Sequence, residues 1–181
     1  MPEQIAGFNG DLVLTTNAET TKSNKIPILC EDILELDPTV IRGLIMQKLG
    51  YAFPSSELLI GIDPGKRIGL SIFYYGKEIE RSLYTSIDNL VFHLVRIFVE
   101  LQPKKRIVRI GNGDMTLAKK ITAILNLNFC SDFEIEFVDE RKTSVKIKNF
   151  NQRGKRDMLS AKFISHRQGN RQLILPLSRT G

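Results

Sequence analysis

The sequence contains no tryptophan, only two cysteines and no long apolar segment. Cys30 and Cys130 lie far apart and belong to no CxxC or cysteine–histidine spacing, so we expect two ordinary thiols rather than a disulfide or a zinc site. The most apolar stretch, residues 90–101, is interrupted by charged side chains and is shorter than the roughly 20 apolar residues of a membrane-spanning helix. The first residues lack the basic and apolar regions of a secretory signal. We therefore expect a cytoplasmic protein that does not enter a membrane.

Neither sign of charge is scarce, but the two signs are separated along the chain. Residues 1–140 carry 15 Lys or Arg against 19 Asp or Glu, whereas residues 141–171 carry 10 against 1. Such a basic segment can simply be solvated, but the neutralisation of phosphates also supplies most of the sequence-independent affinity for nucleic acids. The overall composition, 42% hydrophobic and 25% charged over 181 residues, is that of one ordinary domain and leaves no room for a large two-lobed enzyme.

Residues 1–56 form an N-terminal extension with a pattern of its own. We predict a short strand at 11–15, followed by a polar loop. Asp37 before Pro38 is typical of a helix start, and apolar residues then recur at helical spacing over 38–49. The apolar stripe of this helix must pack against either the main domain or a second copy of the chain, so a homodimer stays open.

Residues 57–181 have the pattern of an α/β domain with the element order β-β-β-α-β-α-β-α. This order predicts a mixed five-stranded sheet flanked by helices, in which an antiparallel hairpin comes first and parallel strands follow. His93 lies on the apolar face of the first helix, and we expect it in the core. The predicted strands are 58–62, 69–75, 78–84, 106–110 and 134–138, and the predicted helices are 90–101, 117–125 and 155–166.

Acidic residues follow the strands at the edge where open α/β sheets bind their ligands. Asp63 ends the first strand, and Asp139 and Glu140 follow the last one, while Asp157 begins the final helix. Strand alternation sends Asp139 and Glu140 to opposite faces and does not decide which of them faces the others. Three carboxylates that meet repel one another unless a cation lies between them, and Mg²⁺ or Mn²⁺ prefers such oxygen ligands.

Small residues accompany Asp157 on the final helix. Ser160 and Ala161 share its face, so this helix can approach the sheet closely enough for Asp157 to reach the first strand. Two divalent cations about 4 Å apart can hold both the attacking and the leaving oxygen of a phosphoryl displacement. Carboxylates that can bind metal ions, together with basic side chains that can bind phosphates, therefore point to the hydrolysis of phosphodiesters.

Three segments of the chain form a set: Gly61-Ile62-Asp63-Pro64-Gly65-Lys66-Arg67-Ile68-Gly69, Asp139-Glu140-Arg141-Lys142-Thr143-Ser144 and Asp157-Met158-Leu159-Ser160-Ala161. Together they resemble the three motifs of the YqgF group, which are relatives of the RuvC Holliday junction resolvases in the ribonuclease H-like superfamily. The resemblance covers about residues 57–168. RuvC resolvases carry a glutamate near the fourth strand, where this chain has Gly111-Asn112-Gly113, so the match favours the YqgF branch.

The resemblance implies a ribonuclease H-like fold and a nuclease that uses Mg²⁺ or Mn²⁺ on branched DNA or structured RNA. It places the catalytic, metal-binding carboxylates at Asp63, Glu140 and Asp157, with Asp139 as the alternative to Glu140. Basic side chains beside these motifs are the expected contacts to nucleic-acid phosphates. They are Lys66, Arg67, Arg141, Lys142, Arg153, Lys155 and Arg156.

Each acidic residue also has an ordinary structural interpretation. Asp63 can cap the turn that follows it, Asp139 and Glu140 can be a solvated strand end, and Asp157 suits the start of a helix. A non-catalytic module that binds nucleic acid or takes part in an assembly is therefore the alternative function. Strongly salt-dependent binding without cleavage would be its mark.

Overall fold

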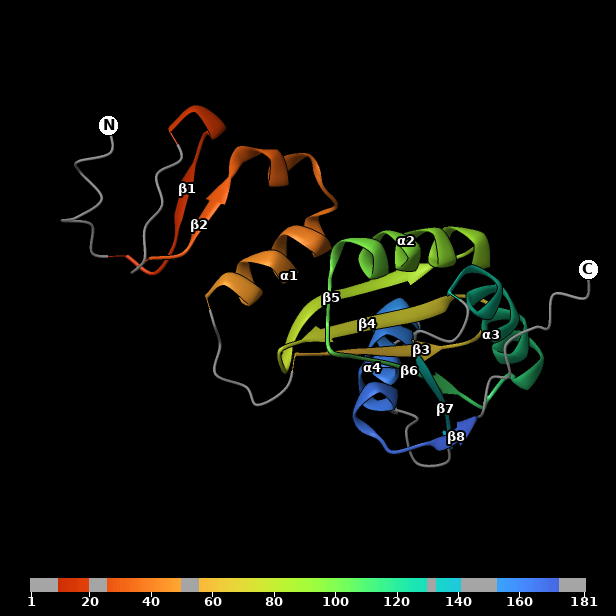
Figure 1. Ribbon diagram of the computed structural model, residues 1–181. Coiled ribbons are helices and arrows are strands. Elements are labelled where there is room, and N and C mark those ends of the chain that lie inside the picture. The colour runs from red at the N-terminus through yellow and green to blue at the C-terminus, as the bar shows by residue number, and fades with distance from the viewer. Residues whose placement is uncertain (1–9, 20–25, 50–55, 130–132, 141–152, 173–181) are drawn as a thin grey trace, which may run out of the picture.

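The computed structural model describes residues 10–19, 26–49, 56–129, 133–140 and 153–172 (Figure 1). A six-stranded mixed sheet with the strand order β5-β4-β3-β6-β7-β8 forms its centre, and the four α-helices of the described ranges pack alongside. The elements of the sheet and its helices are β3 (Glu57–Asp63), β4 (Ile68–Tyr74), β5 (Lys77–Tyr84), α2 (Ile87–Glu100), β6 (Lys105–Gly111), α3 (Met115–Phe129), β7 (Glu134–Val138), α4 (Arg153–His166) and β8 (Asn170–Gln172).

The predicted hairpin and the predicted parallel strands are both present. β4 pairs antiparallel with β3 and β5, and its turn to β5 contains only Tyr75 and Gly76, whose φ values of 49° and 69° are those of a tight hairpin turn. β3, β6 and β7 run parallel to one another. Their carboxyl ends therefore meet at one edge of the sheet, where Asp63 ends β3 and Glu140 follows β7.

The sheet has six strands and not the five that the sequence predicted. The additional strand, β8, pairs antiparallel with β7 at the edge, with Asn170 opposite Phe137. It contains only Asn170, Arg171 and Gln172, so it has no apolar residue and no alternation that could mark it as a strand. Its place in the sheet follows from backbone pairing with β7 and from an ion pair of 3.1 Å between Arg171 and Glu134.

Helices cover both faces of the sheet. α2 and α3 contact each other on one face, and α4 lies across β3, β4 and β6 on the other (Figure 1). Because side chains alternate along a strand, Ile60 and Ile62 enter the core on one side while Gly61 and Asp63 face α4 on the other. The core includes Leu70, Ile72, Leu90, Leu94, Ile97, Val108, Ile110 and Ile121.

The N-terminal extension has its predicted helix and packs it against the main domain. β1 (Val13–Thr15) pairs parallel with β2 (Ile28–Cys30), and α1 (Pro38–Lys48) lies between this pair and the large sheet (Figure 1). Asp37 caps α1 by accepting a hydrogen bond of 2.8 Å from the Thr39 backbone N–H. The buried Val40 joins the main core, so the apolar stripe of α1 packs against this domain. The short 3₁₀ helices η2 (Asn17–Glu19) and η3 (Glu31–Glu35) complete the extension.

His93 is not a simple core residue. Its Nε2 lies 2.6 Å from the carboxylate of Glu80, and its Nδ1 lies 3.3 Å from that of Asp37. These contacts join α2 to β5 and to the start of α1.

No helix in the described ranges is both long enough and apolar enough to cross a membrane.

Candidate functional site

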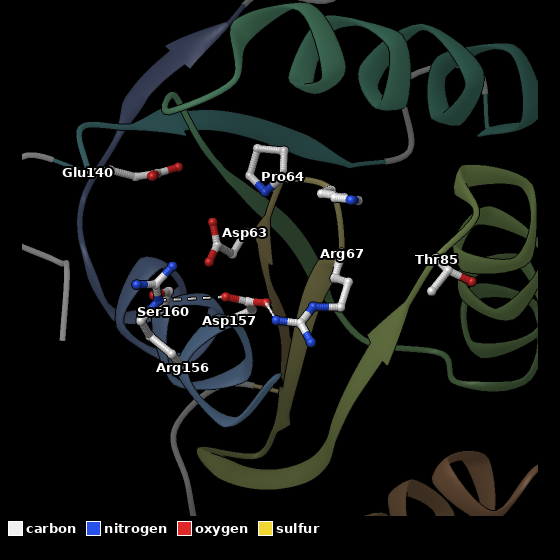
Figure 2. A pocket seen from close by; sticks show the side chains of 10 residues that line it. Asp63, Pro64, Arg67, Thr85, Glu140, Arg156, Asp157 and Ser160 are labelled. Carbon is white, nitrogen blue, oxygen red and sulfur yellow. Dashed lines mark ion pairs between the residues drawn. The ribbon is translucent and has the colours of Figure 1, made fainter. Parts of the chain in front are cut away.

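A pocket of about 800 Å³ opens at the end of β3, between the β3–β4 turn and the start of α4 (Figure 2). Three of its lining residues are the carboxylates Asp63, Glu140 and Asp157, which come from distant parts of the chain. Among the described residues, the lining consists of Asp63, Pro64, Gly65, Lys66, Arg67, Thr85, Glu140, Arg156, Asp157 and Ser160.

Asp63 lies at the centre of this pocket, with Glu140 on one side and Asp157 on the other (Figure 2). Burial and then the negative charges of Glu140 and Asp157 raise the pKa of Asp63 to about 7. A hydrogen bond with Ser160 and the positive charge of Arg156 act in the opposite direction and do not compensate. The site therefore disfavours the ionised form of its central carboxyl group unless positive charge is added.

Glu140 is held by the turn after β6. The Gly113 N–H donates to its Oε1 at 3.0 Å, and the Glu140 N–H donates to Asn112 Oδ1 at 3.1 Å. A Cβ at Gly111 or Gly113 would collide with the Glu140 carboxylate, so a side chain at either position would displace Glu140 from this place. Nothing in the sequence indicated that Gly111-Asn112-Gly113 positions a carboxylate.

The register of the sheet explains this contact. Gly111 of β6 pairs with Val138 of β7, so the residues that follow the two strands lie side by side. Asp139 has an exposed side chain that is not part of the pocket lining, and its carbonyl oxygen accepts a hydrogen bond from Arg167. Of the two candidates at this strand end, Glu140 is the one that the structure brings to Asp63.

Asp157 reaches the pocket because α4 lies directly on the sheet. A Cβ at Gly61 would collide with the Ala161 carbonyl oxygen, and a Cβ at Gly69 would collide with that of Asp157. The close approach predicted from the small residues of this helix is therefore present, and the sheet contributes glycines to it. Arg109 also fixes the end of α4, donating to the Ser165 carbonyl oxygen at 2.6 Å.

Two arginines flank Asp157, one at each carboxylate oxygen (Figure 2). Arg67 Nη2 lies 3.1 Å from Oδ2, and Arg156 Nε lies 3.8 Å from Oδ1. Lys66 lines the same pocket and is exposed.

The other predicted phosphate contacts lie outside the pocket lining or outside the described residues. Lys155 is exposed and lies outside the pocket lining, and Arg153 is the first residue of α4. Arg141 and Lys142 lie outside the described residues.

The donor set has the chemistry of a divalent-cation site. Carboxylate oxygens are the ligands that Mg²⁺ and Mn²⁺ prefer, and a cation would relieve the repulsion that raises the pKa of Asp63. Within the described ranges, however, no three Asp, Glu, His or Cys side chains are grouped closely enough to hold a metal ion. Asp63, Glu140 and Asp157 share the pocket without converging on one point.

No model of a known protein family matches this chain, and no curated protein matches it either.

Proposed function

We propose that the protein is a Mg²⁺- or Mn²⁺-dependent nuclease with a ribonuclease H-like fold of the YqgF type, acting on structured DNA or RNA. The observation that carries the proposal is the pocket in which Asp63, Glu140 and Asp157 meet beside basic side chains. The fold also supports it, because the described elements from β3 to α4 follow the β-β-β-α-β-α-β-α order expected for this domain.

In this proposal each part of the pocket has its own task. Asp63, Glu140 and Asp157 would hold the metal, which supplies Lewis acidity and a water of lowered pKa when bound. Lys66, Arg67 and Arg156 provide the positive charge that a phosphodiester backbone requires. The Gly113 N–H and the Asn112 side chain keep Glu140 at the pocket, and Ser160 orients Asp63 by a hydrogen bond.

The test combines metal binding with cleavage in one preparation. We expect calorimetry to show Mg²⁺ or Mn²⁺ binding by the native protein and its loss in Asp63→Asn. The native protein should cleave at least one member of a panel of labelled DNA junctions and structured RNAs. Asp63→Asn should lose cleavage while keeping much of its nucleic-acid binding, because the basic side chains remain.

Two variants at the end of β7 give a matched comparison. Glu140→Gln should lose metal binding and cleavage, whereas Asp139→Asn should keep both, because only Glu140 lines the pocket. Cleavage by Asp63→Asn at the native rate would disprove the nuclease proposal. Equal losses in Glu140→Gln and Asp139→Asn would instead show that the two residues have no separate roles.

A second candidate function is a non-catalytic module that binds nucleic acid. It is favoured by the same structural observation that limits the first, namely that the carboxylates are not grouped around a metal position. In that case binding should weaken steeply with salt, with a slope of about −0.9 in log affinity per neutralised phosphate on duplex DNA. No variant should then bind a divalent cation at millimolar concentration, with or without nucleic acid.

A further inference from the structure

Arg67 occupies a carboxylate oxygen that the proposed nuclease needs for its metal. Its Nη2 lies 3.1 Å from Asp157 Oδ2, a separation at which a guanidinium donates a charge-assisted hydrogen bond. Arg156 lies at 3.8 Å from the other oxygen, which is too long for a hydrogen bond. Arg67 is therefore the principal partner of Asp157 in this structure.

The Arg67 side chain lies where it can leave Asp157 without unfolding anything. It extends from the turn between β3 and β4 along the start of α4 (Figure 2), close to Gly154. The side chain is 39% exposed, whereas that of Asp157 is 17% exposed. An ion pair that is partly exposed adds little to stability, so a stronger anion can compete for the arginine.

A phosphodiester is such an anion. The planar guanidinium binds phosphate through two parallel hydrogen bonds, which a single carboxylate oxygen does not offer it here. Arg67 lines the same pocket as Lys66 and Arg156, so a bound phosphate would find it within the basic rim. Its departure would free Asp157 and remove a positive charge that repels a divalent cation.

We propose that Arg67 couples nucleic-acid binding to metal binding by exchanging its ion pair with Asp157 for a contact to the bound phosphodiester. Without nucleic acid, Arg67 keeps Asp157 away from the other two carboxylates, and the metal site stays incomplete. With a phosphodiester in the pocket, Asp157 is released to Asp63 and Glu140. The inference rests on the proposed function, and it accounts for three carboxylates that share a pocket without converging.

Coupling of this kind is reciprocal, so it is measurable without cleavage. The experiment follows Mn²⁺ binding by electron paramagnetic resonance, with and without dimethyl phosphate as a small phosphodiester that resists hydrolysis. We expect dimethyl phosphate to raise the Mn²⁺ affinity of the native protein by about fivefold or more. Arg67→Gln should bind Mn²⁺ more tightly than the native protein without dimethyl phosphate, and should gain nothing further from it.

Lys66→Gln is the matched control, because it removes the same charge from the same pocket but not the partner of Asp157. Lys66→Gln should bind dimethyl phosphate more weakly, but saturating dimethyl phosphate should still raise its Mn²⁺ affinity as in the native protein, because Arg67 still holds Asp157. An equal gain of Mn²⁺ affinity in Lys66→Gln and Arg67→Gln would reduce the effect to general electrostatics and overturn the coupling. Native Mn²⁺ affinity in Arg67→Gln, with binding lost in Asp63→Asn, would overturn the coupling but leave the nuclease proposal. Absence of Mn²⁺ binding from every variant would overturn both.

Discussion

Asp63 lowers the stability of the folded protein, because the end of β3 places its carboxyl group in a partly buried site beside other acidic side chains. The strand directs this side chain toward α4 and into a partly buried site beside Glu140 and Asp157. The surroundings raise its pKa to about 7, so near neutral pH the native protein holds a proton that the unfolded chain has released. A residue that destabilises its own fold is expected where function, and not packing, determines its identity.

This cost predicts that Asp63→Asn is more stable than the native protein when no metal is present. A raised carboxyl pKa means that native stability falls as pH rises from about 4 to about 7, and the full penalty is present above pH 7. Asn carries no charge, so at pH 8 the variant should gain about 1 kcal/mol, or a few degrees in melting temperature. Thermal unfolding in a chelating buffer measures this difference.

Mg²⁺ and a neighbouring variant provide the controls for that measurement. Mg²⁺ should raise the melting temperature of the native protein and not that of Asp63→Asn, because a ligand stabilises only the state that binds it. Asp139→Asn should not show the gain of Asp63→Asn, because Asp139 lies outside the pocket lining. A lower melting temperature for Asp63→Asn at pH 8 would show that the Asp63 carboxylate contributes net stability.

At the scale of single residues the sequence predicted a group of carboxylates, but not how they are held or which of Asp139 and Glu140 reaches the pocket. Asp139 and Glu140 both follow the end of β7 at Val138, where strand alternation no longer fixes direction. Their placement depends on Asn112 and Gly113, which are far away in the chain and reach Glu140 only through the β6–β7 register. No local pattern contains that information.

At the scale of elements the site depends on how closely α4 approaches the sheet. Gly61 and Gly69 face this helix from β3 and β4, and neither has room for a side chain. The helix backbone therefore lies against the strands, and the Asp157 carbonyl oxygen sits where a Cβ at Gly69 would be. Asp157 can face Asp63 only because this approach is so close.

We predict that Gly69→Ala displaces the first turn of α4. The added methyl group meets backbone atoms of Asp157, which cannot rotate away as a flexible side chain would. Overpacking of this kind costs about 1–3 kcal/mol, and metal binding should weaken because Asp157 moves. Chemical denaturation and Mn²⁺ binding measure the two effects.

Gly65→Ala is the comparison for that variant. Gly65 lies in the turn that leads into β4, but a Cβ there would meet only the Arg67 carbonyl oxygen, at 3.4 Å. It should unfold and bind Mn²⁺ nearly as the native protein does. If Gly65→Ala and Gly69→Ala behave alike, the closeness of α4 to β4 does not position Asp157.

Regular elements were predictable where one face is buried, and less so at the edge. β3 to β7 and α1 to α4 all have apolar periodicity or turn signals, because each buries a face against a neighbour. β8 has none, since its three polar residues depend on β7 for backbone partners. The six-stranded sheet was therefore predicted as five-stranded.

On the scale of the whole molecule, the N-terminal helix α1 is joined to the main domain through a buried polar cluster. Glu80 accepts a hydrogen bond of 2.8 Å from the Thr39 hydroxyl of α1, and it contacts His93 of α2 at 2.6 Å. Asp37, which caps α1, faces the other nitrogen of His93. The pairing of β4 with β5 shifts register just before Glu80, since Phe73 pairs with Glu78 and Ile72 pairs with Glu80. Composition and periodicity predicted α1 but could not reveal this attachment.

The pKa values of Glu80 and His93 set the pH range over which this polar cluster joins α1 to the main domain. Burial alone would lower the pKa of His93, but the hydrogen bond and charge of Glu80, with the charge of Asp37, outweigh it and raise the pKa. The positive charge of Arg96 opposes them. Burial would likewise raise the pKa of Glu80, but hydrogen bonds with His93, Ser82 and Thr39 lower it. The ion pair is therefore complete between about pH 4.5 and 6.5, below the ordinary His pKa and above that of Glu.

We predict that the protein loses stability as pH rises above 6.5, because His93 releases its proton through its raised pKa. His93→Gln should remove this part of the pH dependence and leave the contribution of Asp63, which ends near pH 7. At pH 6 the variant should be less stable by about 3 kcal/mol, since Glu80 keeps a buried charge without its partner. Denaturant unfolding across pH measures both effects.

His166→Gln is the matched control, because His166 is the second of the two histidines and is exposed on α4. It should leave the pH profile unchanged, and a profile flattened by His166→Gln but not by His93→Gln would place the titrating group on α4 and away from α1.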